Sequence, residues 1–176
     1  MNHEILEQVQ APVKGFSLPR YHEIPDIGLY LEQTSKYVSE CLQPFLPEGM
    51  TGSMISNYVK RGVLESPHKK QYSREQIARL IWIAAVKAVL PMENIKLMFT
   101  IERQCCTPQT AYDYFCSEFE NVLEYVFGFK ESLSTIGTTH TDEKFLLRNI
   151  VVSAAHALYL GRMFDALHDR DPSQIL

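Results

Sequence analysis

The sequence lacks the short motifs that mark the common enzyme sites. It contains no glycine-rich phosphate loop, no HExxH metal motif and no GxSxG nucleophile motif. No general base is suggested beside a cysteine or serine that could act as a nucleophile. An internal repeat and a low-complexity tract are absent as well. These absences argue against an enzyme, and nothing in the sequence indicates a cofactor.

Cysteine is scarce and badly spaced for a zinc site. No CxxC pair occurs, and the adjacent residues Cys105 and Cys106 are poor chelators of one tetrahedral ion. A metal site that joins them to Cys116 and to His156 or His168 is the alternative to simple burial. We expect burial of the thiols, and a core position for His156, which lies in a mostly apolar segment.

Long hydrophobic runs are missing too. The longest, residues 149–161, contains Asn, Ser and His and is too short to span a bilayer. Residues 1–15 are polar and acidic rather than basic and then apolar, so they do not predict a secretory signal. The sequence therefore favours a cytoplasmic protein with reduced thiols and no membrane contact.

Positive charge is present but unevenly distributed. The chain has 176 residues, 45% of them apolar, which is enough for a core, and a net charge of −4. Residues 51–100 carry eight Lys or Arg against three Asp or Glu, whereas the parts on either side are acidic. A basic middle third is typical of a nucleic-acid-binding surface, although a solvated helix face with internal ion pairs is the plainer explanation.

The middle third predicts a short helix with one polar face. Thr51 can cap its start, and Gly62 follows its end, where a left-handed residue is favoured. Ile55 and Val59 are four residues apart and would pack inward. We interpret residues 53–61 as the recognition helix of a helix-turn-helix. Its opposite face carries side chains that suit base edges and phosphates: Ser53, Ser56, Asn57 and Lys60.

A basic turn follows this helix. Lys69 and Lys70 lie between the apolar positions at Val63-Leu64 and Tyr72. This pattern is typical of a small β-hairpin, or wing, that lies against phosphates.

These residues resemble the DNA-binding domain of the MerR-type regulators. The resemblance implies a winged helix-turn-helix that reads DNA. Ser56 and Asn57 stand where those regulators have Arg and Tyr, so the Arg contact is not carried over. The matching positions are Ile55, Tyr58, Gly62, Leu64, Tyr72, Ser73, Leu80, Ile83, Glu93 and Ile95.

A closer resemblance extends from Leu18 to the end of the chain. The runs 18–33, 53–60 and 67–77 are similar to a bacterial family catalogued as domain of unknown function 1836. That family implies a fold rather than an activity.

The rest of the chain is expected to brace the recognition helix. Residues 1–17 predict a loose lead or a short frayed helix, and a helix from Asp26 to Pro44 would form the brace. Ser73 and Gln76 have the spacing of a capping box, so we expect the next helix to begin there. The first part of this helix, including Arg79, is expected to be exposed to solvent. From Leu80 to Leu90 this helix is apolar on nearly every side and needs cover on both sides.

Later helices are predicted to start at Pro91, Thr107-Pro108 and Thr141. The last two would cover residues 80–90. The fold class is therefore mostly α, with a winged helix-turn-helix domain over residues 18–104 and a helical cover over 105–176, which is where a dimer or effector surface would lie. The helix from Pro108 is expected to have an acidic outer face that includes Asp113, Glu118, Glu120, Asn121 and Glu124.

Two functions fit this pattern. The favoured one is a transcriptional regulator that binds double-stranded DNA, with Ser53, Ser56 and Asn57 in the groove. A homodimer would be needed, because one recognition helix reads too few bases. In the DNA-binding function, the residues expected to contact phosphates are Lys60, Arg61, Lys69, Lys70 and Arg74.

The alternative is a protein-interaction module that keeps the winged-helix shape without binding DNA.

Overall fold

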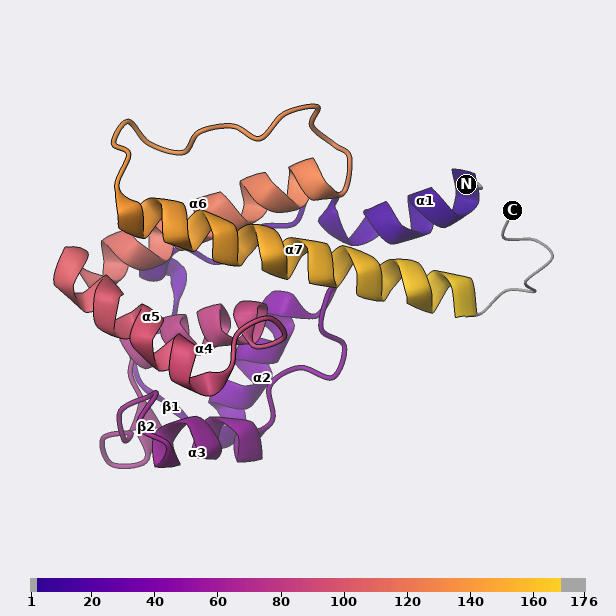
Figure 1. Cartoon of the computed structure of the whole chain (residues 1–176). Coiled ribbons are helices and arrows are strands. Elements are labelled where there is room, and N and C mark those ends of the chain that lie inside the picture. Colours follow the sequence, from indigo (N-terminus) through magenta and orange to yellow (C-terminus); the bar gives the residue numbers. More distant parts are fainter. Residues whose placement is uncertain (1–2, 169–176) are drawn as a thin grey trace.

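The computed structural model describes residues 3–168, which form a helical body with one short β-ribbon (Figure 1). The prediction of a mostly α fold with a small β wing and a helical C-terminal part is confirmed. In chain order the elements are α1 (His3–Gln10), η1 (Ala11–Val13), η2 (Tyr21–Glu23), β1 (Leu29–Tyr30), α2 (Leu31–Leu42), α3 (Gly52–Lys60), β2 (Gln71–Tyr72), α4 (Arg74–Val86), α5 (Met92–Cys105), α6 (Pro108–Val126) and α7 (Asp142–His168).

The helix α4 lies in the middle of the body and is buried on every side. All of its residues from Gln76 to Val86 are buried. It packs against α2, and also against α6 and α7, which lie above it in Figure 1. The predicted all-round burial is confirmed for residues 80–86, and so is the predicted cover by the two last helices. It is wrong for residues 87–90, because α4 ends at Val86 and Ala88 is exposed.

The helix α7 is the longest element and carries part of this cover. By length and composition alone it could cross a membrane, with a mean hydropathy of 1.2 over its best window. Here it packs against α1, α4, α5 and α6, and 39% of that window is buried. Its large apolar residues are not all covered, since Phe145 and Phe164 are 70% and 57% exposed.

Two N-terminal predictions need correction. Of the two alternatives for the first residues, the short helix forms, as α1, but it is packed rather than frayed, because it lies against α7 and buries Ile5 and Val9. The brace, α2, begins at Leu31 rather than at Asp26, and Ile27 is 83% exposed instead of facing the core. The cause is that β1 occupies the positions just before Leu31 and pairs with β2.

Two polar side chains predicted to be exposed are buried, and a histidine predicted to be buried is exposed. Glu118 and Asn121, placed on the acidic outer face of α6, are buried, because α7 and the loop before it cover that face. Arg148 of α7 pairs with Glu118, and the Asn121 amide donates to the Ser134 carbonyl at 2.9 Å. His156, expected in the core, is exposed.

The prediction that Arg79 is exposed to solvent is also wrong, because this residue is buried. Its Nη2 lies 2.8 Å from a carboxylate oxygen of Glu75 and 3.5 Å from one of Glu102. Its guanidinium also lies 5.5 Å from the centre of the Phe99 ring. Burial raises the pKa of Glu102, and the charge of Arg79 opposes that rise. Arg79 therefore joins α4 to α5.

A small hydrogen-bond clamp fixes α3 against α2. The Ser35 hydroxyl donates to the Met50 carbonyl at 2.6 Å, and the Met50 amide donates to the Ser39 hydroxyl at 2.9 Å. Gly49, just before, has a φ of 63°, and a Cβ there would lie 2.3 Å from the Ser39 Oγ. Only glycine fits this turn without displacing Ser39.

We expect Gly49→Ala to lower the free energy of unfolding by about 2 kcal/mol, because it adds both backbone strain and a steric clash. The control is Gly161→Ala in α7, where no atom lies within 4 Å of the added Cβ. That change should stabilise the protein by about 0.5 kcal/mol, since alanine favours helix more than glycine does. Urea denaturation of both variants measures the difference. Equal stability of Gly49→Ala and wild type would show that the clamp does not fix the turn.

Candidate nucleic-acid interface

The helix α3 forms as its sequence predicts. The Thr51 hydroxyl caps it by accepting from the Met54 amide at 3.2 Å. Ile55 and Tyr58 are buried on its inner side. Gly62 follows its end with a φ of 69°, so the predicted left-handed stop is confirmed.

The outer side of α3 carries the four polar residues predicted there, and Arg61 follows at its end. All five are exposed, and all but Arg61 line a hollow of about 540 Å³ between α3 and the start of α2. Glu32 of α2 lines the same hollow and adds a negative charge beside them. The five residues are Ser53, Ser56, Asn57, Lys60 and Arg61.

The β-ribbon ties the starts of α2 and α4 together. β1 and β2 are antiparallel, with Leu29 opposite Tyr72. Tyr72 was expected to pair with Val63 and Leu64 in a local hairpin, and this is a correction. The amides of Val63 and Leu64 instead donate to the Tyr58 carbonyl, at 3.0 and 3.2 Å, and so close the end of α3.

The basic tight turn before β2 is present. The Gln71 amide donates to the His68 carbonyl at 2.9 Å, with Lys69 and Lys70 between them. Their φ angles are 48° and 66°, and both side chains are exposed. This left-handed pair is the conformation that Asn-Gly adopts most readily, so two lysines hold it at a cost in backbone energy.

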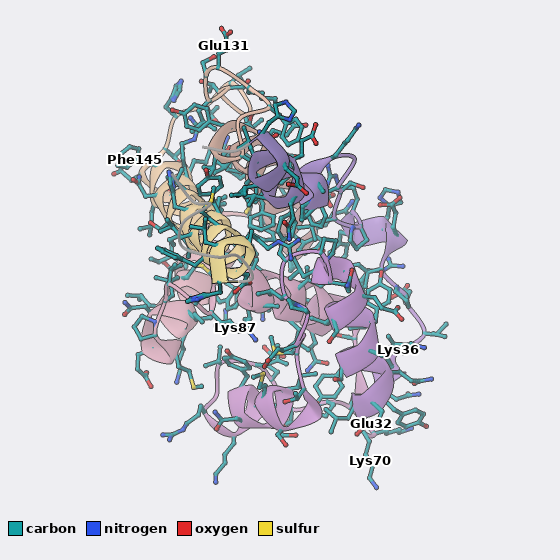
Figure 2. All side chains as sticks on the ribbon, turned by 90° about the vertical axis from the view of Figure 1, so that its right-hand side faces the viewer. Glu32, Lys36, Lys70, Lys87, Glu131 and Phe145 are labelled. Atoms are coloured by element: carbon teal, nitrogen blue, oxygen red, sulfur yellow. The ribbon has the colours of Figure 1, made fainter. Side chains whose placement is uncertain are left out.

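The surface that α3 and this turn share lies at one end of the molecule (Figure 1). Lys70 projects from that end, and Glu131 of the loop between α6 and α7 lies at the opposite end (Figure 2). We call the outer side of α3 together with Lys69 and Lys70 the basic end. The basic end thus lies at the opposite end of the body from the loop between α6 and α7.

Arg74 differs from the other predicted phosphate ligands. Its Nε donates to the Ile24 carbonyl at 2.9 Å, its Nη2 lies 3.7 Å from Asp26, and it lies over the Tyr21 ring. The guanidinium is therefore engaged in holding the segment before β1. These contacts give Arg74 a role in the fold, and its role as a phosphate ligand stays a prediction.

Sequence reasoning missed Lys96, which α5 brings beside the end of α3. Its Nζ lies 3.6 Å from the position that a Cβ on Gly62 would take, and the side chain is exposed. No sequence signal indicates it, because only the packing of α5 places it next to Lys60 and Arg61. Lys96 extends the positive charge at this end.

The cysteines offer no site of their own. Within residues 3–168 no group of three or more His, Cys, Asp and Glu side chains could hold a metal ion. Cys116 is buried, whereas Cys105 and Cys106 are exposed. Burial raises the pKa of the Cys41 and Cys116 thiols to about 12, so these thiols are protonated at neutral pH.

The fold and the basic end define a small helical domain that presents a helix and a cationic β-turn together. Residues 19–115 match the model of the family described as "Domain of unknown function (DUF1836)", and the chain belongs to that family. The match covers the basic end but stops at Phe115, before the C-terminal part that was expected to belong to the resemblance. Neither the curated proteins nor the solved structures contain a match to the chain.

The strained turn yields a stability prediction. Lys69→Asn with Lys70→Gly should raise the free energy of unfolding by about 1 kcal/mol, because these residues adopt the left-handed conformation more easily. Lys69→Ala with Lys70→Ala removes the same two charges but keeps a Cβ on each residue, and should bring no such gain. Thermal and urea denaturation compare the two double variants. A gain of equal size in both would attribute the effect to charge repulsion rather than to the backbone.

Proposed function

We propose that this protein is a DNA-binding transcriptional regulator that uses a MerR-like winged helix-turn-helix. In this proposal α3 enters the major groove, with Ser53, Ser56 and Asn57 toward the base edges. The Lys69–Lys70 turn acts as the wing on the phosphate backbone. Lys60 and Arg61 take phosphates at the end of α3.

The observation that supports this most is the pair of lysines in the left-handed turn. Asparagine and glycine would make the same turn at a lower cost. A strained position that retains two cationic side chains suggests that their charge is used. Both side chains are exposed, and the turn lies at the same end of the molecule as the exposed polar side of α3. That combination suits a partner with closely spaced negative charges, as on duplex DNA.

The helix pair also resembles a helix-turn-helix in its arrangement. α2 packs against α3 and braces it. The connection between them runs from Gln43 to Thr51, which is longer than the turn of about three or four residues in the simplest examples. A two-fold operator would require a homodimer, because a single short helix reads few base pairs.

A protein-interaction module is the second candidate, and Glu32 favours it. This carboxylate lines the hollow beside Ser56 and Asn57, where it would repel a phosphate. Arg74, engaged with Asp26 and Ile24, does not compensate for it. A polar or basic peptide in the hollow would benefit from the same carboxylate.

Charge reversal in the turn distinguishes these functions. Lys69→Glu with Lys70→Glu should weaken binding to duplex DNA about tenfold or more, and should reduce the slope of log affinity against log salt by about 2. The measurement is fluorescence anisotropy with fragments selected from the source genome, at several stated salt concentrations.

The matched control reverses two exposed lysines outside the basic end, Lys14→Glu with Lys36→Glu, and so changes the net charge equally. It should leave the salt slope unchanged. If both double variants bind like wild type, the wing assignment is wrong. If wild type fails to bind any duplex even at low salt, the proposal fails and the interaction module remains.

A further inference from the structure

One face of α7 is largely apolar and lies open along most of the helix. Leu160 and Phe164 in its second half are 52% and 57% exposed, and Leu146 near its start is 43% exposed. At helical spacing these residues fall on one side, with the exposed Asn149 and Ser153 between them. In Figure 1 the helix runs across the front of the body, and no other element crosses it. Within residues 3–168 nothing covers this face.

The polar side chains on this face make hydrogen bonds within α7 itself. The Asn149 side-chain amide donates to the Phe145 carbonyl at 2.8 Å, and the Ser153 hydroxyl donates to the Asn149 carbonyl at 2.9 Å. The Nδ1 atom of His156 lies 2.8 Å from the Val152 carbonyl. Side chains bonded to their own helix keep these bonds when another surface covers them, so covering them costs little. The face can therefore accept an apolar cover.

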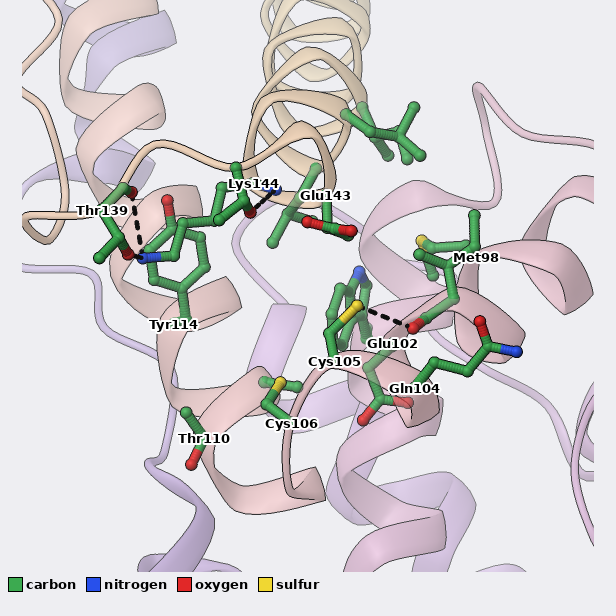
Figure 3. Close-up of a pocket in the computed structure, with 17 residues that line it drawn as sticks. Met98, Glu102, Gln104, Cys105, Cys106, Thr110, Tyr114, Thr139, Glu143 and Lys144 are labelled. Carbon is green, nitrogen blue, oxygen red and sulfur yellow. Dashed lines mark hydrogen bonds between the residues drawn. The ribbon is translucent and has the colours of Figure 1, made fainter.

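A hollow of about 550 Å³ opens beside the start of this face, between α5, α6 and α7 (Figure 3). Cys105 and Cys106 are exposed at its rim. The protruding ring of Phe164 lies on the same helix, about 27 Å along it from Leu146. Apolar side chains from all three helices line the hollow: Met98, Ile101, Ala111, Leu146, Leu147 and Ile150.

A hollow near one end of a helix and a protruding ring near its other end are complementary to a second copy of the same helix. In a two-fold pair both subunits use the same surface, so each must carry both halves of every contact. Antiparallel packing of two α7 helices brings Phe164 of each copy to the hollow of the other. It also brings the acidic first turn of one helix, Asp142 and Glu143, beside the exposed His168 of the other, where a protonated imidazole is attracted.

A lipid surface suits this face less well than a second copy does. Helices that lie on a membrane are rich in Lys and Arg beside their apolar face, where these residues meet anionic lipid. Two of the three such residues in α7 are held against α6 instead. The Lys144 ammonium lies 4.9 Å from the centre of the Tyr114 ring, and Arg148 pairs with Glu118.

We propose that two copies of this chain pair through the open face of α7, antiparallel, with Phe164 of each copy seated in the hollow of the other. A face about 40 Å long and about 10 Å wide is small for a stable dimer, so we expect a dissociation constant of about 10 µM. This pairing gives the two basic ends a two-fold arrangement. It does not depend on DNA binding, and its test uses no DNA.

Sedimentation velocity measures the association directly. Between about 1 and about 200 µM, wild type should change from monomer to dimer. Phe164→Asp should weaken this association at least about thirtyfold, because it removes the ring from both hollows. The matched control is Ile27→Asp, on an apolar side chain that is 83% exposed in the segment before β1. It adds the same charge and should leave the association unchanged.

Cross-linking tests the arrangement of the two helices. In a background with Cys105→Ser and Cys106→Ser, Leu146→Cys combined with Phe164→Cys should give a disulfide between chains on oxidation with copper phenanthroline in air. The two positions are about 27 Å apart along one helix, so they cannot join within a chain. Each cysteine alone should leave monomers on a denaturing, non-reducing gel, because antiparallel packing separates it from its own copy.

The proposal is overturned if wild type remains a monomer at about 200 µM, or if Phe164→Asp associates no more weakly than Ile27→Asp. It is also overturned if either single cysteine variant cross-links, or if the combined variant does not. A dimer that binds no duplex DNA would contradict the proposed function alone. A monomer that binds DNA would contradict this inference alone.

Discussion

A helix that is apolar on its whole circumference cannot face water, and α4 therefore needs cover along every side. α2 supplies it on one side, and α6 and α7 supply it elsewhere. At the start of α4, the side-chain amide of Gln76 donates to the Glu65 carbonyl at 2.8 Å and so holds the segment that leads to the basic turn. In the middle of α4, Trp82 stacks on Phe115 of α6 and meets Phe99 of α5 edge-on. One buried helix thus connects the segment before the basic turn to the helices that follow it.

The cover is oriented by ion pairs as well as by apolar packing. Arg20 makes two bonds of 2.7 Å to the Glu120 carboxylate, which also accepts from the Leu18 amide, and both side chains are partly buried. Arg148 joins α7 to the buried carboxylate of Glu118 in a similar way. Apolar contacts alone tolerate sliding between helices, whereas loss of the partner of a buried carboxylate is costly and so penalises other arrangements. These pairs fix how the extended segment at Leu18 and the helix α7 lie on α6.

The sequence predicted those features that depend on neighbours along the chain. Caps at Thr51 and Ser73 and the tight turn at Lys69 follow from side chains a few residues apart, and they form as expected. Partners that are distant in sequence were not predictable. Tyr72 pairs with Leu29, and Glu118 becomes buried, only because separate segments meet in the fold. For the basic end, the exposure of α3 was predictable from its periodicity, but the engagement of Arg74 by the segment before β1 was not.

The boundary of the family match has a physical consequence. Residues 19–115 contain α2 to α5 and only the first part of α6. Without the later residues, the side of α4 that faces α7 and the second half of α6 would meet water. The matched stretch carries the whole basic end, yet it buries too little of α4 to hold that end in place by itself. The stability of the basic end therefore depends on the cover, even though no residue of α6 or α7 belongs to it.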